Sequence, residues 1–318
     1  MLKTLPEISE QIYAEDILDV LENKYSTIGP IWTNHQMEWY NAVYRTFKDH
    51  NKYLIIIYLI KKTLDFYSRN FVKLTYNEFY SKDIVEIEKF NIIEVSKNIN
   101  IPKESTRRKI IELEKNGIIK RSKKKIVIDR SAYRVVKPNN SIKRISRFLS
   151  LFSKVLVDEK ILLNPLSSEL LQKVIEKNFS YIWKLYYEMQ IPMLLNYKKV
   201  FNDLETFHIY GTCVVNQHFY SKKINENKMN REEFIKSIYS NDEMIGINAM
   251  SISDITGIPR ATVVRKLKKL VKLKHLTIDK KKHYRMTGLF IKKLIPLQNI
   301  VLNHLAKFST KVFNLAIL

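Results

Sequence analysis

Residues 96–125 read SKNINIPKESTRRKIIELEKNGIIKRSKKK, and residues 253–282 read SDITGIPRATVVRKLKKLVKLKHLTIDKKK. The two stretches align without a gap, and each ends in three lysines. The alignment includes these identical pairs: Ile101 and Ile258, Pro102 and Pro259, Arg108 and Arg265, Lys109 and Lys266, Leu113 and Leu270, Lys115 and Lys272. An internal repeat of this kind predicts a fold built from two similar units.

Each copy predicts a basic helix with one apolar face. An Ile-Pro turn precedes the helix, and proline suits a turn or a first helical position. Apolar positions recur at i, i+4 and i+7 in both copies, at Thr106, Ile110 and Leu113 and at Val263, Leu267 and Leu270. That spacing predicts one stripe facing a core and an opposite face that carries charge, including Arg108 and Arg265.

Two short apolar runs follow each basic helix. They cover residues 118–121 and 126–128 in the first copy, and residues 276–278 and 283–286 in the second. A lysine-rich turn separates the two runs in both copies. This pattern predicts a small β-hairpin with a basic tip in each copy.

Together these elements resemble the winged helix-turn-helix domain, in the style of the MarR and IclR families of bacterial regulators. The resemblance rests on the Ile-Pro-(Lys/Arg)-x-(Ser/Thr) start of the basic helix, on Arg108 and Arg265, on the phrase from Leu113 to Ile119, and on the lysine wings. It covers roughly residues 79–135 and 234–290. The second copy departs from the pattern because Lys274 stands in place of Gly117, so we expect its helix to end without the usual glycine.

The resemblance implies that each basic helix reads base edges in the major groove and that each wing touches the DNA backbone or the minor groove. In the first copy the implied readers are Lys103, Ser105, Arg107, Arg108 and Lys109. In the second they are Arg260, Thr262, Val264, Arg265 and Lys268, with Val264 meeting a thymine methyl group. The implied backbone contacts of the wings are Lys123, Lys124, Lys125, Lys280, Lys281 and Lys282.

The distribution of charge favours a polyanionic partner. The chain has a net charge of +23. Residues 97–125 carry 11 basic and 3 acidic side chains, and residues 254–285 carry 11 basic and 2 acidic ones. A biased base composition of the gene explains abundant lysine, but it explains neither this placement nor the arginines. Basic charge gathered on two predicted reading surfaces indicates nucleic-acid binding.

The rest of the chain predicts helices. We expect them near residues 7–24, 37–50, 53–70, 141–157, 167–189, 192–222, 231–239 and 288–318, with breaks at residues 28–30, 137–141, 164–165 and 222–231. The fold class expected is mainly α with two small β-hairpin wings, in two winged helix-turn-helix units joined and flanked by long helices. The domains expected are an N-terminal helical segment (1–35), a first unit (36–160) and a second unit (161–318).

One chain with two units predicts an intramolecular pseudo-dimer. The protein would act as a monomer of this kind or as a homodimer. Its two basic helices differ, so we expect two unlike DNA half-sites, centred about 10 bp apart if the units pack two-fold.

Other chemistry is sparse. The single Cys213 excludes an internal disulfide and a multi-cysteine zinc site. His208, Cys213 and His218 are spaced five apart, which on a helix separates them by about 140°, so we expect no metal there. His275 and His283 flank the second wing and read as solvated histidines. No catalytic motif is present, and we expect neither an enzyme nor a cofactor.

The sequence also bears on location and ligands. The apolar run 53–60 is too short for a bilayer, which needs about 20 residues, so we expect no membrane partner. The single Cys213 fits a reduced, intracellular setting, and we expect a cytoplasmic protein. Aromatic residues including Trp32, Trp39 and Trp183 are interpreted as core, and no small-molecule effector is assigned.

The functional prediction is a sequence-specific double-stranded DNA-binding transcription regulator. Two alternatives remain open. A plasmid-type replication initiator also resembles two linked winged-helix units, and a non-catalytic nucleic-acid or protein scaffold would use such units only as structure.

Overall fold

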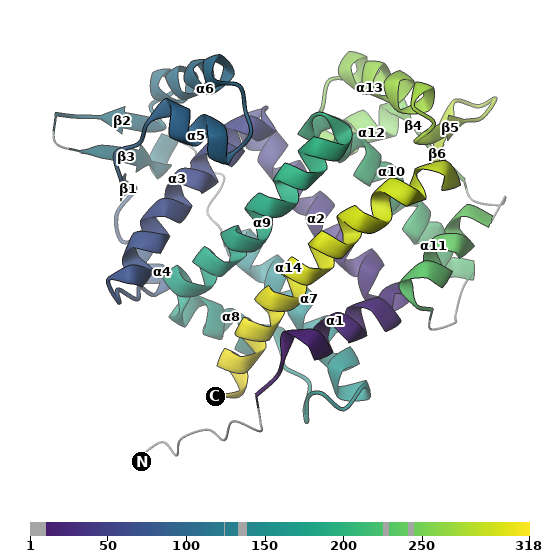
Figure 1. Cartoon of the computed structure of the whole chain (residues 1–318), viewed down its shortest axis with the longest axis horizontal. Coiled ribbons are helices and arrows are strands. Elements are labelled where there is room, and N and C mark those ends of the chain that lie inside the picture. The colour runs from purple at the N-terminus through teal and green to yellow at the C-terminus, as the bar shows by residue number, and fades with distance from the viewer. Residues whose placement is uncertain (1–10, 124, 133–138, 225–228, 241–244) are drawn as a thin grey trace.

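The computed structural model describes residues 11–123, 125–132, 139–224, 229–240 and 245–318. These residues form a mainly helical molecule with two small three-stranded antiparallel sheets (Figure 1). The first half contains α1 (Ala14–Asn23), α2 (Tyr25–Phe47), α3 (His50–Arg69), α4 (Tyr76–Tyr80), β1 (Ile84–Ile87), α5 (Ile92–Asn98), α6 (Lys103–Lys115), β2 (Ile119–Arg121), β3 (Ile126–Asp129) and α7 (Asn139–Asp158).

The second half repeats this order. It contains α8 (Ser168–Lys177), α9 (Phe179–Phe201), α10 (Leu204–Ile224), α11 (Arg231–Ser240), β4 (Ile247–Asn248), α12 (Ala249–Thr256), α13 (Arg260–Lys272), β5 (Leu276–Ile278), β6 (His283–Met286) and α14 (Ile291–Ile317). A 3₁₀ turn at Gly288–Phe290 leads into α14. The repeat therefore extends well beyond the two basic stretches and begins at α1.

The long helices α2 and α9 illustrate this repetition. Both have 23 residues and place a glutamine, Gln36 or Gln190, among their buried positions. Both end at a residue with left-handed backbone, Lys48 with φ 52° and Asn202 with φ 68°. Because the buried positions recur while most side chains differ, the repeat is a repeat of packing more than of sequence.

The two halves exchange contacts across their interface. Helix α3 packs on α9, and its counterpart α10 packs on α2. In the same way α1 packs on α14, while α8 packs on α7. One continuous cluster of buried apolar residues runs through both halves. The two halves therefore share a core, which apolar burial from each half stabilises.

The basic helices α6 and α13 are anchored as predicted. Their inward stripes are buried: Thr106, Ile110 and Leu113 in α6, and Val263, Leu267 and Leu270 in α13. A serine in the preceding helix closes the turn in each copy. The Oγ of Ser96 donates to the carbonyl of Ile101 at 2.6 Å, and the Oγ of Ser253 donates to that of Ile258 at 2.7 Å.

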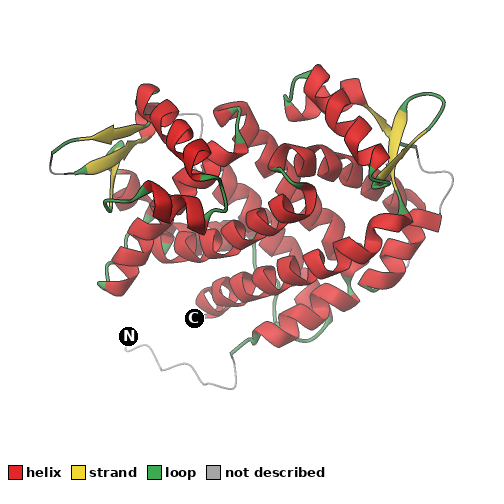
Figure 2. Cartoon of the chain, turned by 45° about the horizontal axis from the view of Figure 1, so that its top comes forward, coloured by secondary structure: helices red, strands yellow, loops and turns green. Residues whose placement is uncertain are grey.

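Both predicted hairpins are confirmed, and each gains a third strand that the sequence did not predict. The strand orders are β1-β3-β2 and β4-β6-β5. Ile119 pairs with Ile128 in the first sheet, and Leu276 pairs with Met286 in the second. Figure 2 shows the two hairpins at opposite ends of the molecule.

The helix C-terminus of the second copy keeps the usual backbone without glycine. Gly117 has φ 72°, and Lys274 at the equivalent position has φ 57°. The following amides make equivalent bonds, from Ile118 to Leu113 and from His275 to Leu270, both at 2.9 Å. As expected, this helix ends without a glycine. The lysine adopts the left-handed conformation instead.

One predicted helix break, at residues 28–30, and the predicted start of a new helix at residue 192 are wrong. Helix α2 runs through Gly29 and Pro30, and α9 runs through Pro192. Pro30 and the neighbours of Pro192 are buried, so tertiary packing holds these helices together despite one lost backbone hydrogen bond at each proline. The domain boundary expected after residue 35 falls inside α2, whereas the one after residue 160 falls between α7 and α8.

Candidate nucleic-acid interface

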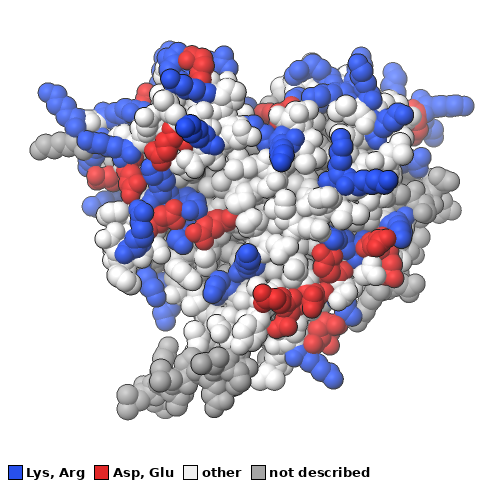
Figure 3. All heavy atoms as spheres, in the orientation of Figure 1, with Lys and Arg blue, Asp and Glu red and all other residues white. Residues whose placement is uncertain are grey.

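The two basic helices lie along the same edge of the molecule. Figure 1 shows α6 and α13 at the top, with a hairpin to the outside of each. In Figure 3, Lys and Arg side chains gather over these helices and hairpins. Acidic side chains form one group around α1, whose first turn holds Glu15 and Asp16, and others are interspersed with basic ones below α6. On this face, basic side chains are densest along the edge formed by α6, α13 and the two hairpins.

In the first copy, two of the predicted reader side chains are exposed without a hydrogen bond or ion pair within the described chain. These are Lys103 and Arg108. Arg107 is also exposed, but its guanidinium donates to both carboxylate oxygens of Glu104, at 2.9 and 2.6 Å. The guanidinium holds the pKa of the Glu104 carboxyl below its ordinary value. Ser105 is half-buried at the margin of the exposed face.

In the second copy, three cationic side chains are exposed and carry no hydrogen bond or ion pair with described residues. These are Arg260, Arg265 and Lys268. Thr262 and Val264 lie half-buried on the flanks of the same face. The structure therefore brings together on α13 all five residues predicted for this copy.

Lys109 departs from the expectation. Its side chain is only 15% exposed, and its Nζ contacts the carboxylate of Asp49, which caps α3 by accepting from the amide of Asn51 at 2.8 Å. Lys266 occupies the equivalent position of the second copy and contacts Asp203. Because the ammonium group of Lys109 is bound by Asp49 at the start of α3, it fixes the position of α6 and is not free to contact DNA. Lys109 is therefore corrected from a reader to a positioning residue.

The wings expose most of their predicted lysines. Lys123, Lys125, Lys280, Lys281 and Lys282 are exposed. Lys124 lies outside the described residues. At the base of the first wing, β2 pairs with β3, and Lys120 on β2 donates to the carboxylate of Asp129 on β3 at 2.6 Å. This hydrogen bond lowers the pKa of the Asp129 carboxyl to about 2.

Two basic residues that the sequence analysis missed link the halves beneath this edge. Arg45 on α2 donates to the carbonyl of Ile255 in α12 at 3.2 Å. Lys198 on α9 donates to the carbonyl of Asn100, in the turn before α6, at 2.6 Å. The segment that precedes each basic helix is therefore held by a long helix from the other half. Both residues sit in or near the last turn of their helices, a position that sequence reasoning assigns to the helix dipole.

The histidines differ from expectation at one position. His275 is buried and stacks on Phe290 with ring centroids 3.6 Å apart, so it is not solvated. Burial, with Lys293 nearby, lowers its pKa to about 4. His283 is partly exposed and its Nδ1 lies 3.4 Å from Asp279. The Nε2 of His208 lies 2.7 Å from Asn41 Oδ1, and the described residues contain no group of three or more His, Cys, Asp or Glu able to hold a metal ion.

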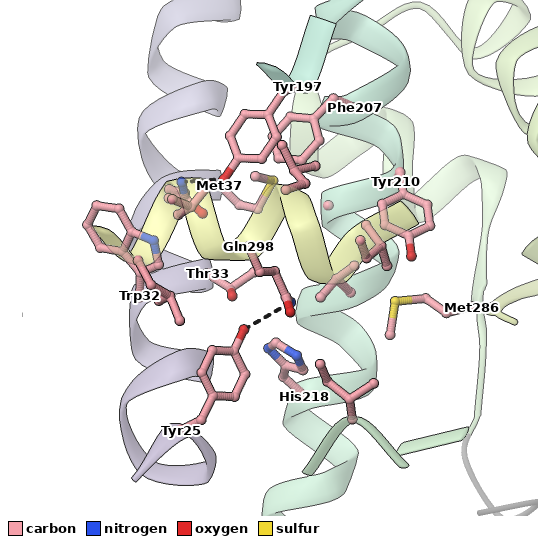
Figure 4. A pocket seen from close by; sticks show the side chains of 18 of the residues that line it. Tyr25, Trp32, Thr33, Met37, Tyr197, Phe207, Tyr210, His218, Met286 and Gln298 are labelled. Carbon is pink, nitrogen blue, oxygen red and sulfur yellow. Dashed lines mark hydrogen bonds between the residues drawn. The ribbon is translucent and has the colours of Figure 1, made fainter. Parts of the chain in front are cut away.

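A cavity of about 90 Å³ lies between α2, α10 and α14 (Figure 4). In Figure 4 the Tyr25 hydroxyl meets the side chain of Gln298, whose Nε2 donates to it at 3.2 Å. Tyr197 and Phe207 stack above them with ring centroids 3.7 Å apart. The space is smaller than the roughly 150 Å³ that accommodates benzene, so we interpret it as a gap in the core.

No helix in the described part of the chain is both long and apolar enough to cross a membrane. Neither a scan of protein-family models nor searches of curated proteins and of solved structures find a match to this chain.

Proposed function

We propose that this protein is a sequence-specific double-stranded DNA-binding transcription regulator with two non-identical winged helix-turn-helix readers in one chain. The observation that carries the proposal is the equivalence of Arg108 and Arg265. Each is exposed, lacks a described ion-pair partner, and lies on a basic helix anchored by three buried positions. Free arginines on a rigid support suit bidentate contact with guanine or phosphate.

Binding energy and selectivity come from different side chains in this proposal. Lysines of the wings neutralise phosphates, which makes binding dependent on salt. The exposed faces of α6 and α13 enter the major groove, where Lys103, Ser105, Arg107 and Arg108 read one half-site. Arg260, Thr262, Val264, Arg265 and Lys268 read the other.

Glu104 gives the first reader a second mode of recognition. In the free protein it is bound by Arg107. A carboxylate in the major groove accepts a hydrogen bond from the N4 amino group of cytosine. On DNA the pair either stays together as one unit or opens so that both side chains meet bases. The second copy has Ala261 at the equivalent position and lacks this device.

The pseudo-dimer is supported by the exchanged packing of the halves. Each basic helix rests on a helix of its own half, and the segment before it is bound by the end of a long helix from the other half, through Arg45 or Lys198. This arrangement fixes the two readers relative to one another. We therefore expect one binding site with two unlike halves, about 10 bp apart.

Selection of bound duplexes from a random pool, near 150 mM salt, tests the proposal. An enriched motif with two unlike halves supports it, and a motif with perfect dyad symmetry contradicts the unlike readers. Motifs repeated in tandem beside an AT-rich region would favour a replication initiator. If no motif is enriched and binding is lost as the salt concentration rises, the protein binds nucleic acid only through non-specific electrostatic attraction, and the scaffold alternative is favoured.

A further inference from the structure

A second cavity, of about 320 Å³, opens between α2, α7 and α10. It lies within the size range of small-molecule pockets, about 300 to 1,000 Å³. Polar side chains from α2 and α7 line one part of it: Asn34, His35, Glu38, Arg144 and Arg147. Its apolar lining includes Phe148 and Phe219. A cavity of this size with cations and aromatic rings in its walls is suited to a ligand.

Within the described part of the chain, neither of the two arginines has a carboxylate partner. Arg147 is exposed and makes no hydrogen bond or ion pair with the described residues. Arg144, one turn earlier, donates from Nη2 to the hydroxyl of Ser141 at 3.2 Å, while its buried Nε has no partner there. Glu38 is the acidic residue in the lining, and it accepts from the amide of Asn34 at 3.0 Å. Arginine on a helix beside a cavity offers planar donors for a carboxylate or phosphate.

His35 adds an unsatisfied polar atom to the same lining. The residue is only 6% exposed, and its Nε2 is buried without a hydrogen-bond partner in the described chain. Its ring stacks on Trp32, with centroids 5.3 Å apart, and lies 6.0 Å from the ring of Phe148. Buried polar atoms are nearly always paired in folded proteins. A ligand oxygen in the cavity would satisfy this one.

The internal repeat supplies a comparison within one molecule. The cap residues Asp49 and Asp203 align α2 with α9 and α3 with α10. In that alignment the pocket residues Pro30, Asn34, Val215 and Phe219 have as counterparts Lys184, Glu188, Lys61 and Asp65.

Those counterparts pair with one another. Lys61 lies 2.7 Å from Asp65, Lys184 lies 2.9 Å from Glu188, and Lys61 also lies 3.9 Å from Glu188. The place equivalent to the cavity, between α3 and α9, is thus covered by a closed set of ion pairs. The cavity between α2 and α10 has neutral residues at those positions and two arginines from α7 in its lining, so it is not a general consequence of the fold.

From these observations we infer that the cavity between α2, α7 and α10 is a binding site for a small organic anion with an apolar body. Its carboxylate or phosphate group binds Arg144 and Arg147, and a ligand oxygen meets His35. The apolar body lies against Phe148 and Phe219. This inference does not depend on the proposed DNA binding.

Titration calorimetry with phenyl phosphate and with 3-phenylpropionate tests the site and separates the two anionic groups. We expect saturable binding of at least one of them and none of uncharged benzyl alcohol. Because charged hydrogen bonds contribute strongly, Arg147→Gln should weaken binding by about tenfold. Arg144→Gln should weaken it as well. Arg147 is exposed, so its variant should keep the fold even if that of Arg144 does not.

Two controls locate the bound anion. Lys61→Gln, at the counterpart position, should leave the dissociation constant unchanged. The double variant Arg108→Ala/Arg265→Ala should also bind as tightly as the parent, because those residues lie on the basic edge. Equal affinity of Arg147→Gln and the parent, or loss of binding in the double variant, would overturn the inference.

Discussion

The Nζ of Lys266, on the basic helix α13, lies 2.5 Å from the Oδ2 of Asp203 and forms an ion pair with it. Asp203 directly precedes the long helix α10. Asp203 also accepts from the amide of Thr206 at 2.7 Å, so one carboxylate both caps α10 and holds α13. Lys109 and Asp49 have the same relationship in the first half. The two basic helices are therefore fixed to their supports by the same device.

Removing the charge of Asp203 should weaken this attachment. Asparagine caps helices about as well as aspartate, so Asp203→Asn should remove mainly the ion pair and cost about 2 kcal/mol of unfolding free energy. Urea denaturation at pH 7 measures this. Lys268→Met, which changes an exposed lysine on the same helix, should stay within about 0.5 kcal/mol of the parent.

The same pair should depend on pH. Burial alone would raise the pKa of the Asp203 carboxyl, but hydrogen bonds from Lys266 and Thr206 outweigh it and the pKa lies below its ordinary value. The contribution is therefore present above the unfolded pKa, about 3.9, and is lost as pH falls through the folded pKa. The free energy of unfolding of Asp203→Asn should therefore fall less than that of the parent over this acid range. An equal fall in both proteins would contradict the contribution of this ion pair.

Lys274 should be a site where glycine stabilises the protein. A non-glycine residue in left-handed backbone costs roughly 1 to 2 kcal/mol, and a glycine would remove this cost. Part of the gain is offset, because glycine gives the unfolded chain more conformational freedom. We expect Lys274→Gly to raise the free energy of unfolding by about 0.5 to 1 kcal/mol. Gly117→Lys is the matched reverse change, and it should lower stability by a similar amount. The same sign for both changes would contradict the repeat of backbone at these positions.

Buried His35 should make the protein sensitive to acid. Burial, with Arg144 as a further cause, lowers its pKa to about 3. The unfolded chain therefore binds more protons below pH 6.5, and stability should fall by up to about 1.4 kcal/mol per pH unit from this residue as pH decreases toward 3. Urea denaturation at pH 7, 6 and 5 measures this. The free energy of unfolding should fall less steeply with decreasing pH for His35→Gln than for the parent. The same dependence on pH in both proteins would show that His35 does not cause this loss.

The readers should fail one half-site at a time. On a selected duplex, Arg108→Ala should cost about 1 to 3 kcal/mol and relax preference in one half only, and Arg265→Ala should do the same in the other. Substituting Lys281 by alanine should weaken all sequences alike and reduce the slope of log affinity against log salt by about 1. Binding measured by fluorescence anisotropy across half-site mutants decides the matter. Uniform loss on every duplex for both arginine variants would remove the base-reading role.

The sequence predicted the parts of the fold that depend on local pattern. The basic helices, their buried stripes and both hairpins follow from helical spacing and from apolar runs about a turn. The identical turn at Ile101 and Ile258 made the repeat visible there. The free arginines at positions 108 and 265 were found for the same reason, because side chains opposite a buried stripe face solvent.

Features that depend on distant contacts were not predictable in this way. The repeat of α2 and α9 is hidden because packing is conserved while residues differ. At one such place Ile57 corresponds to Gly211, whose Cα lies so close to Met37 that an added Cβ would approach its Sδ to 2.5 Å. The role of Lys109 was missed because its partner Asp49 is 60 residues away in sequence. The helices through Pro30 and Pro192 persist for the same reason, since burial outweighs local preference.

The contact between Ile12 and Asn314 gives the chain an unusual connectivity. The side chain of Asn314 accepts from the amide of Ile12 and donates to its carbonyl, both at 2.9 Å, and so joins α14 to the start of α1. The chain segment from α7 to α8 makes the equivalent connection, because α7 and α8 correspond to α14 and α1 in the repeat. The two halves are thus joined at two equivalent junctions, one through the peptide chain and the other through the hydrogen bonds of Asn314. A circular permutant with these junctions exchanged would retain every helix-to-helix contact of the parent, with the order of its two halves reversed.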